Sequence, residues 1–250
     1  MNQYFNLKRF VSLLKLELYK SRRGIFLTFV VTFGLHFFIG FLLALLVDDH
    51  LTVYSHDENY AVSLLIGGFI LSSLAFSDLS YPLKKPAYLL LPASVLEKFL
   101  SMWLLTTVGW VLLYTITFTA YTWFVNGIGP VFFSDIQFEW FNPFGELAIK
   151  TIGYYVVLQG IFLVGATQFK AYVLLKTLFV LVLVAMFAGS IAYLMLSGLS
   201  HTGEECLTDP GAFEASTVYR FWQVVKILFW WVLAPVTWLI TYHGVKEKEV

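Results

Sequence analysis

The segment DLSYPLKKPAYLLLPASVLEK, residues 78–98, lies between two hydrophobic runs that are long enough to cross a membrane. It contains Pro82, Pro86 and Pro92, and each proline fixes φ and removes a backbone hydrogen-bond donor. The segment therefore cannot form one continuous helix, and we expect only a short helix near residues 87–91. It decides where one membrane helix ends and the next begins.

The start of the next helix is marked by Ser94 and Glu97, which have the Ser-x-x-Glu spacing of a capping box. In this motif the hydroxyl and the carboxylate each accept a hydrogen bond from a backbone N–H group in the first turn. We therefore expect a long helix to begin near Val95. Lys84 and Lys85 precede the short helix, and we expect both to be exposed.

The composition is typical of a polytopic integral membrane protein. Hydrophobic residues make up 59% of the 250 residues and charged residues only 13%, which is more apolar than a soluble domain. A transmembrane helix needs about 20 mostly apolar residues. The predicted fold class is all-α, with one transmembrane domain over residues 1–250 and six transmembrane helices: residues 24–47, 61–77, 95–125, 147–166, 173–196 and 221–242.

Residues 1–23 are predicted to form a separate amphipathic helix. Its apolar residues recur at helical spacing on one face, and its polar residues occupy the other. The apolar face consists of Leu7, Phe10, Val11, Leu14 and Leu18, and the polar face of Lys8, Arg9, Ser12 and Lys15. We expect this N-terminal interfacial helix to lie along the inner leaflet of the membrane.

Several residues predict details of helix shape and contact. Small residues in the second span permit close approach of another helix. These are Gly67, Gly68, Ser72 and Ser73. Pro235 predicts a kink in the sixth span. Gly127, Gly129 and Pro130 are expected to break the third helix and to open an outer loop.

The distribution of charge predicts the orientation. Only Lys150, Arg220 and Lys226 of the sixteen basic residues fall on the predicted outer side, which leaves thirteen on the inner side. Eleven of the sixteen acidic residues fall on the outer side. Because cytoplasmic loops carry the excess of Lys and Arg, both termini and residues 78–98 are expected in the cytoplasm.

Two polar side chains, His36 and Gln159, are predicted to lie at membrane depth, where an ionisable or polar group is costly. His36 has two interpretations. A neutral imidazole can be satisfied across a helix interface by a hydroxyl such as that of Ser72 or Thr106, or the residue can belong to a transport pathway. The same two alternatives hold for Gln159.

Catalytic motifs are missing from the sequence. It contains no Gly-x-x-x-x-Gly-Lys-Ser/Thr phosphate loop, no His-Glu-x-x-His, no Gly-x-Ser-x-Gly and no pair of cysteines. We expect no enzymatic activity, metal or cofactor in this chain. An intramembrane serine hydrolase that uses His36 is an alternative, but no serine is marked by a loop motif or a supporting acid.

The proline-bounded short helix, the lysines before it and the LLLPAS-x-x-EK sequence that closes it resemble the cytoplasmic coupling segment of ABC-2 type transporter permeases. The resemblance implies a permease subunit that couples ATP hydrolysis by a separate ABC ATP-binding subunit to translocation of a substrate. It also implies a homodimer, or a heterodimer with a second permease, in the bacterial inner membrane. The implied coupling residues are Lys84, Lys85, Leu90, Pro92, Ser94 and Glu97.

The sequence departs from the larger members of that family in one region. Those proteins place a re-entrant apolar helix between the fifth and sixth spans, whereas residues 197–219 of this chain are polar and acidic. The outer gate therefore cannot be inferred from the resemblance.

A rival interpretation is a membrane scaffold or assembly factor that does not transport and uses the same helices for protein contacts. The small number of intramembrane charges favours it. Within the transport interpretation the same feature favours a lipid-like or amphipathic substrate, because a polar substrate ordinarily needs more polar groups. No nucleic acid is expected as a partner. A neighbouring gene for an ABC ATPase would discriminate between the two interpretations.

Overall fold

The computed structural model describes residues 5–46, 53–80, 83–132, 137–198 and 217–249. The side chains of some residues within these ranges, including His36, lie outside the described part. The interpretations of His36 therefore stay predictions.

The described residues are almost entirely helical, which confirms the predicted fold class. The helices are α1 (Leu7–Leu46), α2 (Asp57–Leu74), α3 (Ser77–Ser80), α4 (Lys85–Leu89), α5 (Val95–Leu104), α6 (Trp110–Phe132), α7 (Glu146–Gln168), α8 (Val173–Gly198), α11 (Thr217–Ile227) and α12 (Ala234–Glu249). Two π-helical segments, η1 (Leu105–Gly109) and η2 (Leu228–Leu233), lie within longer helical runs. Two-residue strands, β1 (Val53–Tyr54) and β2 (Gln137–Phe138), pair in parallel.

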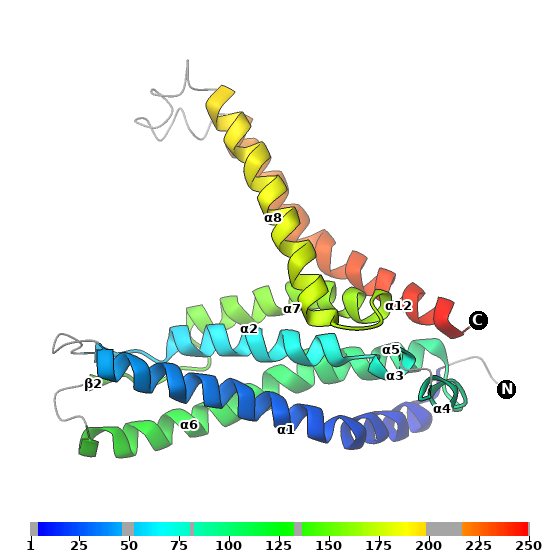
Figure 1. The fold of residues 1–250 in the computed structure, drawn as a ribbon, viewed down its shortest axis with the longest axis horizontal. Coiled ribbons are helices and arrows are strands. Elements are labelled where there is room, and N and C mark those ends of the chain that lie inside the picture. Colours follow the sequence, from blue (N-terminus) through cyan, green and yellow to red (C-terminus); the bar gives the residue numbers. More distant parts are fainter. Residues whose placement is uncertain (1–4, 47–52, 81–82, 133–136, 199–216, 250) are drawn as a thin grey trace.

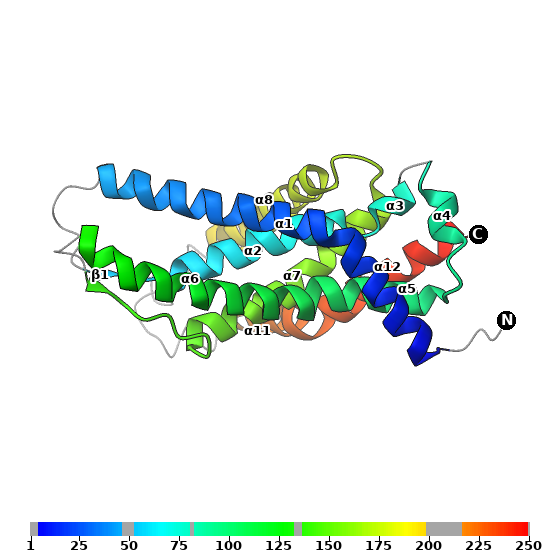
Figure 2. The same cartoon turned by 90° about the horizontal axis from the view of Figure 1, so that it is seen from below.

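The helices α1, α2, α6 and α7 run side by side in an elongated bundle (Figure 1). Both chain ends lie at one end of it, and β1 and β2 lie at the other (Figure 2). Within the bundle α2 packs against α1 and α7, and α12 packs against α7 and α5. In contrast, α8 leans away from the bundle axis (Figure 1).

Five helical stretches of the described chain are long and apolar enough to cross a membrane. They are Asp57–Leu79, Val95–Ile128, Glu146–Gln168, Val173–Ile191 and Trp222–Glu249. They correspond to the second to sixth predicted spans. The first predicted span, residues 24–47, falls in α1 and is not among these five, so the count of six stays a prediction.

The N-terminal part of the chain differs from the prediction in one respect. Instead of a separate helix over residues 1–23 followed by a span, α1 runs without interruption over Leu7–Leu46. Its first turns point in a different direction from the rest of the helix (Figure 2). Leu13 and Glu17 are buried against the protein, whereas Leu7 and Leu18 are exposed. An exposed apolar face suits a membrane surface, but an interfacial position stays a prediction.

The third helical run begins at Val95, as the capping box predicted, but it continues further than expected. The run α5–η1–α6 extends to Phe132, through Gly127, Gly129 and Pro130, which were wrongly predicted to end it. Pro130 lies in the last turn, so its missing N–H removes only one hydrogen bond at the C-terminal end of the helix.

The sixth predicted span is bent at the predicted place. The π-helical segment η2 ends immediately before Ala234 and Pro235, and α11 and α12 run in different directions on its two sides (Figure 1). A proline cannot donate to the carbonyl four residues earlier, which explains the widened turn before it.

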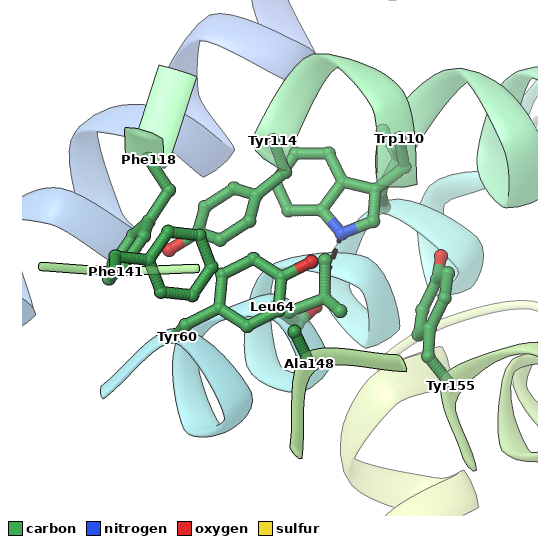
Figure 3. Packing of buried hydrophobic residues seen from close by; sticks show 9 residues of the cluster. Tyr60, Leu64, Trp110, Tyr114, Phe118, Phe141, Ala148 and Tyr155 are labelled. Atoms are coloured by element: carbon green, nitrogen blue, oxygen red, sulfur yellow. Dashed lines mark hydrogen bonds between the residues drawn. The ribbon is translucent and has the colours of Figure 1, made fainter. Parts of the chain in front are cut away.

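An aromatic cluster fills the part of the bundle between α2, α6 and α7 (Figure 3). Its buried members are Tyr60, Leu64, Leu71, Trp110, Tyr114, Phe118, Phe141, Ala148 and Tyr155. The polar atoms of the rings have partners: Trp110 Nε1 donates to the Leu64 carbonyl at 3.1 Å, and the Tyr114 hydroxyl donates to Ser63 Oγ at 2.6 Å. Phe141 comes from the predicted outer loop and folds over the bundle, while Trp140 beside it is exposed.

Glycines allow the large rings to approach α2. A Cβ atom on Gly67 would collide with the Trp110 ring, and one on Gly68 would collide with the Tyr155 ring. Both rings are almost fully buried and cannot swing into solvent. The close contact predicted from the small residues of the second span is confirmed.

We expect Gly68→Ala to destabilise the fold by about 1–3 kcal/mol, because the added methyl group overpacks the α2–α7 contact. The measurement is thermal unfolding of the purified protein in detergent. Gly34→Ala is the matched control, since a Cβ at Gly34 meets no atom within 4 Å. Equal melting temperatures for the two variants would contradict this account of the contact.

Candidate functional site

The capping box predicted at the start of α5 is present in full. Ser94 Oγ accepts a hydrogen bond from the Glu97 N–H at 3.2 Å, and Glu97 Oε2 accepts one from the Ser94 N–H at 2.8 Å. Ser94 has extended backbone geometry, as an N-cap residue requires. The two side chains thus satisfy two N–H groups that the first turn of a helix leaves without partners.

The carboxylate of Glu97 also holds the start of α1. Its Oε1 atom accepts hydrogen bonds from the Asn6 N–H at 2.7 Å and from Arg9 Nη2 at 3.0 Å. Asn6 in turn caps α1, because its Oδ1 atom accepts from the Lys8 N–H at 2.9 Å. Glu97 is fully buried, so these donors replace the water that its charge has lost.

A second charged residue in the same turn, Lys98, connects α5 to two more elements. Its Nζ atom forms a 2.8 Å ion pair with Glu249 at the end of α12 and lies 5.3 Å from the ring centroid of Tyr88 in α4. Lys98 is only 2% exposed. The first turn of α5 therefore contacts α1, α4 and α12 at one place.

We call this set of residues the terminal junction: Asn6, Arg9, Ser94, Glu97, Lys98 and Glu249.

The short helix of the predicted coupling segment is present but begins earlier than expected. It covers Lys85–Leu89 instead of residues 87–91. Pro86 lies in its first turn, where the missing N–H of a proline costs nothing. Lys84, at the N-cap, is exposed as predicted and forms an ion pair with Asp78 at 3.6 Å. The prediction for Lys85 was wrong, because Lys85 is the first residue of α4 and is half-buried.

Apolar side chains point outward beside this helix. Leu83 is 95% exposed and Leu90 is 82% exposed, and Pro92 is exposed as well. Two grooves flank the turn that follows. One of about 310 Å³ lies between Pro92 and the first turns of α1, and the other, of about 540 Å³, lies between Ser94 and the end of α12. The segment thus offers an uneven, partly apolar surface next to the terminal junction.

The structure brings together only some of the predicted site residues. Ser94 and Glu97 share one hydrogen-bonded cluster, whereas Lys84 and Leu90 are the N-cap and C-cap residues of α4 and lie outside that cluster. Four junction residues were missed as site residues: Asn6, Arg9, Lys98 and Glu249. One signal was available, because a lysine in the first turn of a helix is disfavoured by the helix dipole and therefore indicates an acidic partner.

Gln159 lies elsewhere, in the buried contact between α2, η1 and α7. Its Nε2 atom donates to Thr107 Oγ1 at 2.8 Å, and its Oε1 atom accepts from Ser72 Oγ at 3.4 Å. Beside it the Tyr155 hydroxyl donates to the Thr106 carbonyl at 2.5 Å. Both side-chain groups of Gln159 therefore have partners inside the bundle, as the packing interpretation requires.

Ser72 and Thr106 were the hydroxyls considered as partners for His36. In the structure Ser72 donates to Gln159, and Thr106 donates to the Met102 carbonyl at 2.9 Å. The Thr106 carbonyl and the Thr107 hydroxyl lie in η1, where the wider turn frees backbone carbonyls for such contacts.

Comparison of the chain with family models, with curated proteins and with solved structures gives no match. The fold therefore defines the protein only at the level of its class. It is an α-helical chain with several helices long and apolar enough to cross a membrane, which indicates an integral membrane protein.

The importance of the Glu97 carboxylate can be measured by substitution. We expect Ser94→Ala to lower the free energy of unfolding by about 1 kcal/mol, because it removes one cap acceptor. Glu97→Ala should cost more, about 3–5 kcal/mol, because it removes the acceptor shared by the Asn6 and Ser94 N–H groups and the ion pair with Arg9. Chemical unfolding monitored by tryptophan fluorescence gives both values. Glu139→Ala, which removes an exposed carboxylate in a loop, is the control and should have no measurable effect.

The contribution of Gln159 to packing can be measured by substitution. We expect Gln159→Leu to lower the free energy of unfolding by about 0.5–1.5 kcal/mol. The effect stays small because the hydroxyl groups that now bond to Gln159 can bond instead to backbone carbonyls of their own helices. Gln223→Leu, at an exposed position, is the control. The measurement is thermal unfolding of both purified variants. A Gln159→Leu variant that unfolds at the same temperature as the Gln223→Leu control would contradict the packing interpretation.

Proposed function

We propose that this chain is the membrane-spanning permease subunit of an ABC-type exporter, which couples ATP hydrolysis by a separate ATP-binding subunit to movement of a substrate. The observation that carries the proposal is the terminal junction. It fastens a short, surface-exposed helix to the first turn of a helix that continues through the whole bundle.

The surface for the ATP-binding subunit is the end of the bundle formed by residues 83–94. Leu83 and Leu90 present apolar side chains there, and Lys84 supplies charge beside them. Interfaces of this kind combine apolar anchors with a polar rim. The grooves on either side of Pro92 and Ser94 would receive side chains of the partner.

The junction provides a route for movement. A displacement of α4 acts on Lys98 through Tyr88, and Lys98 belongs to the same helical turn as Glu97. Because α5, η1 and α6 form one helical run, a tilt of that turn is carried into the bundle core. The same displacement acts on α1 through Arg9 and on α12 through Glu249.

The proposal includes six spans, the first within α1, with both termini in the cytoplasm of a bacterial inner membrane. The excess of basic residues on the predicted inner side supports this orientation. It also includes a second permease subunit, identical or related. Support for that comes from α8 and the start of the last span, which lean away from the bundle and leave their apolar side chains exposed.

The second candidate function, a membrane scaffold that does not transport, is favoured by one observation. The polar groups of Gln159 and the Tyr155 hydroxyl, buried in the bundle, are satisfied by neighbouring protein groups and leave nothing for a polar substrate. A lipid-like substrate would reconcile this observation with transport. Stimulated ATP hydrolysis in an assembled complex separates the two functions.

We expect Leu90→Asp to weaken binding of an ABC ATP-binding subunit encoded beside this chain by at least about tenfold, because it introduces a charge into an apolar contact. The measurement is pull-down from detergent extracts, with ATP hydrolysis measured in the recovered complex. Phe144→Asp is the matched control, since Phe144 is similarly exposed and lies in the predicted outer loop, shortly before the start of α7.

Equal recovery and equal ATP hydrolysis with the parent and the Leu90→Asp variant would remove residues 83–94 as the docking surface. A complex that forms normally but does not respond to ATP would favour the scaffold.

A further inference from the structure

A pocket of about 550 Å³ lies beside the terminal junction, between α1, the end of α2, α3, α4 and η1. Its volume is within the range of about 300–1,000 Å³ that is usual for small-molecule sites. Leu71, Leu74 and Leu105 line its apolar part, and Lys20, Asp78 and Lys84 line its charged part. The combination of an apolar and a charged wall suits an amphipathic ligand.

The carboxylate of Glu17 lies in this pocket and lacks sufficient partners. Its side chain is 2% exposed, and its Oε1 atom has no hydrogen-bond donor among the described residues. The closest cation is Lys20, whose Nζ atom is 3.9 Å away. Burial raises the pKa of the Glu17 carboxyl above its ordinary value, because the charged form has lost its hydration. A ligand that donates hydrogen bonds here would replace that hydration.

The charged wall is held by long ion pairs. Lys20 and Lys84 lie 3.5 Å and 3.6 Å from the two carboxylate oxygens of Asp78. Direct charge-assisted hydrogen bonds between such groups are shorter, about 2.7–2.9 Å. The four groups form a row of alternating charge, Glu17–Lys20–Asp78–Lys84, in which Lys20 Nζ donates a hydrogen bond to Asp78 Oδ2 at 3.5 Å. Their formal charges cancel, which suits a ligand with one positive and one negative group.

The backbone next to Asp78 is strained. Phe76 is buried and has φ of 57°, in the left-handed region that a bulky residue rarely adopts. Such a conformation costs about 1–3 kcal/mol and is found preferentially at functional sites. Here it turns the chain from α2 into α3, which brings Asp78 to the mouth of the pocket.

We propose that this pocket binds the head group of phosphatidylethanolamine, with the ammonium group against the Glu17 carboxylate and the phosphate group against Lys20 and Lys84. The acyl chains leave along the apolar wall at Leu74. A primary ammonium donates the hydrogen bond that Glu17 needs, whereas the quaternary ammonium of phosphatidylcholine has no N–H to donate. The proposal goes beyond transport, since it holds for a permease and for a scaffold alike.

The test is native mass spectrometry of the full chain in detergent, titrated with phosphatidylethanolamine, phosphatidylcholine or phosphatidylglycerol of identical acyl chains. We expect the first lipid to bind at least about tenfold more tightly than the second, the factor expected for one charge-assisted hydrogen bond. In Glu17→Gln that preference should disappear. Glu146→Gln, which removes an exposed carboxylate, should keep it.

A second variant tests the phosphate side of the site. Lys84 has a 63% exposed side chain, so Lys84→Gln does not threaten the fold. Phosphatidylethanolamine and phosphatidylcholine both carry the phosphate, so Lys84→Gln should weaken the binding of both lipids to the same extent. Glu17→Gln should weaken only the binding of phosphatidylethanolamine. The melting temperature of Glu17→Gln should be no lower than that of the parent, since a poorly compensated buried charge has been removed.

Three results would overturn the proposal. The first is equal binding of phosphatidylethanolamine and phosphatidylcholine by the parent. The second is binding of phosphatidylglycerol as tight as that of phosphatidylethanolamine, which would indicate a site with net positive charge. The third is displacement of the lipid by water-soluble phosphoethanolamine at similar concentrations, which would assign the pocket to a free head group.

Discussion

The buried carboxylate of Glu97 is the interaction on which the end of the bundle depends. It accepts hydrogen bonds from Ser94 in its own helix turn and from Asn6 and Arg9 at the start of α1. A carboxylate that has lost its water must keep such donors, because an uncompensated charge in the protein interior costs several kcal/mol, on the order of 3–5 when one partner is removed. Separating α1 from α5 would therefore leave the buried Glu97 carboxylate with fewer donors.

The position of Glu97 in the chain connects the terminal junction to the bundle core. Glu97 lies in the first turn of a helical run that continues through α5, η1 and α6, so the junction is at one end of a single rigid element. Directly after α5, the π-helical turn of η1 supplies a backbone carbonyl to Tyr155 and a hydroxyl to Gln159. The element is thus anchored at its start by charges and, further along at η1, by neutral hydrogen bonds to α7.

Charged and strained groups are concentrated at the end of the bundle that holds the chain termini. Glu17, Lys20 and Asp78 surround the pocket there, and Phe76 holds a left-handed backbone conformation beside them. In the middle of the bundle, Gln159 and Tyr155 engage neighbouring protein groups.

The sequence by itself determined the elements that depend on neighbouring residues. Hydrophobic length predicted five of the helical stretches, and the spacing of Ser94 and Glu97 predicted the start of α5, because a cap forms within one turn. Tertiary structure alone decided the partners of those residues. Arg9 and Glu97 are 88 positions apart and Lys98 and Glu249 are 151 apart, and helical periodicity defines the faces of a helix without specifying which face meets which neighbour.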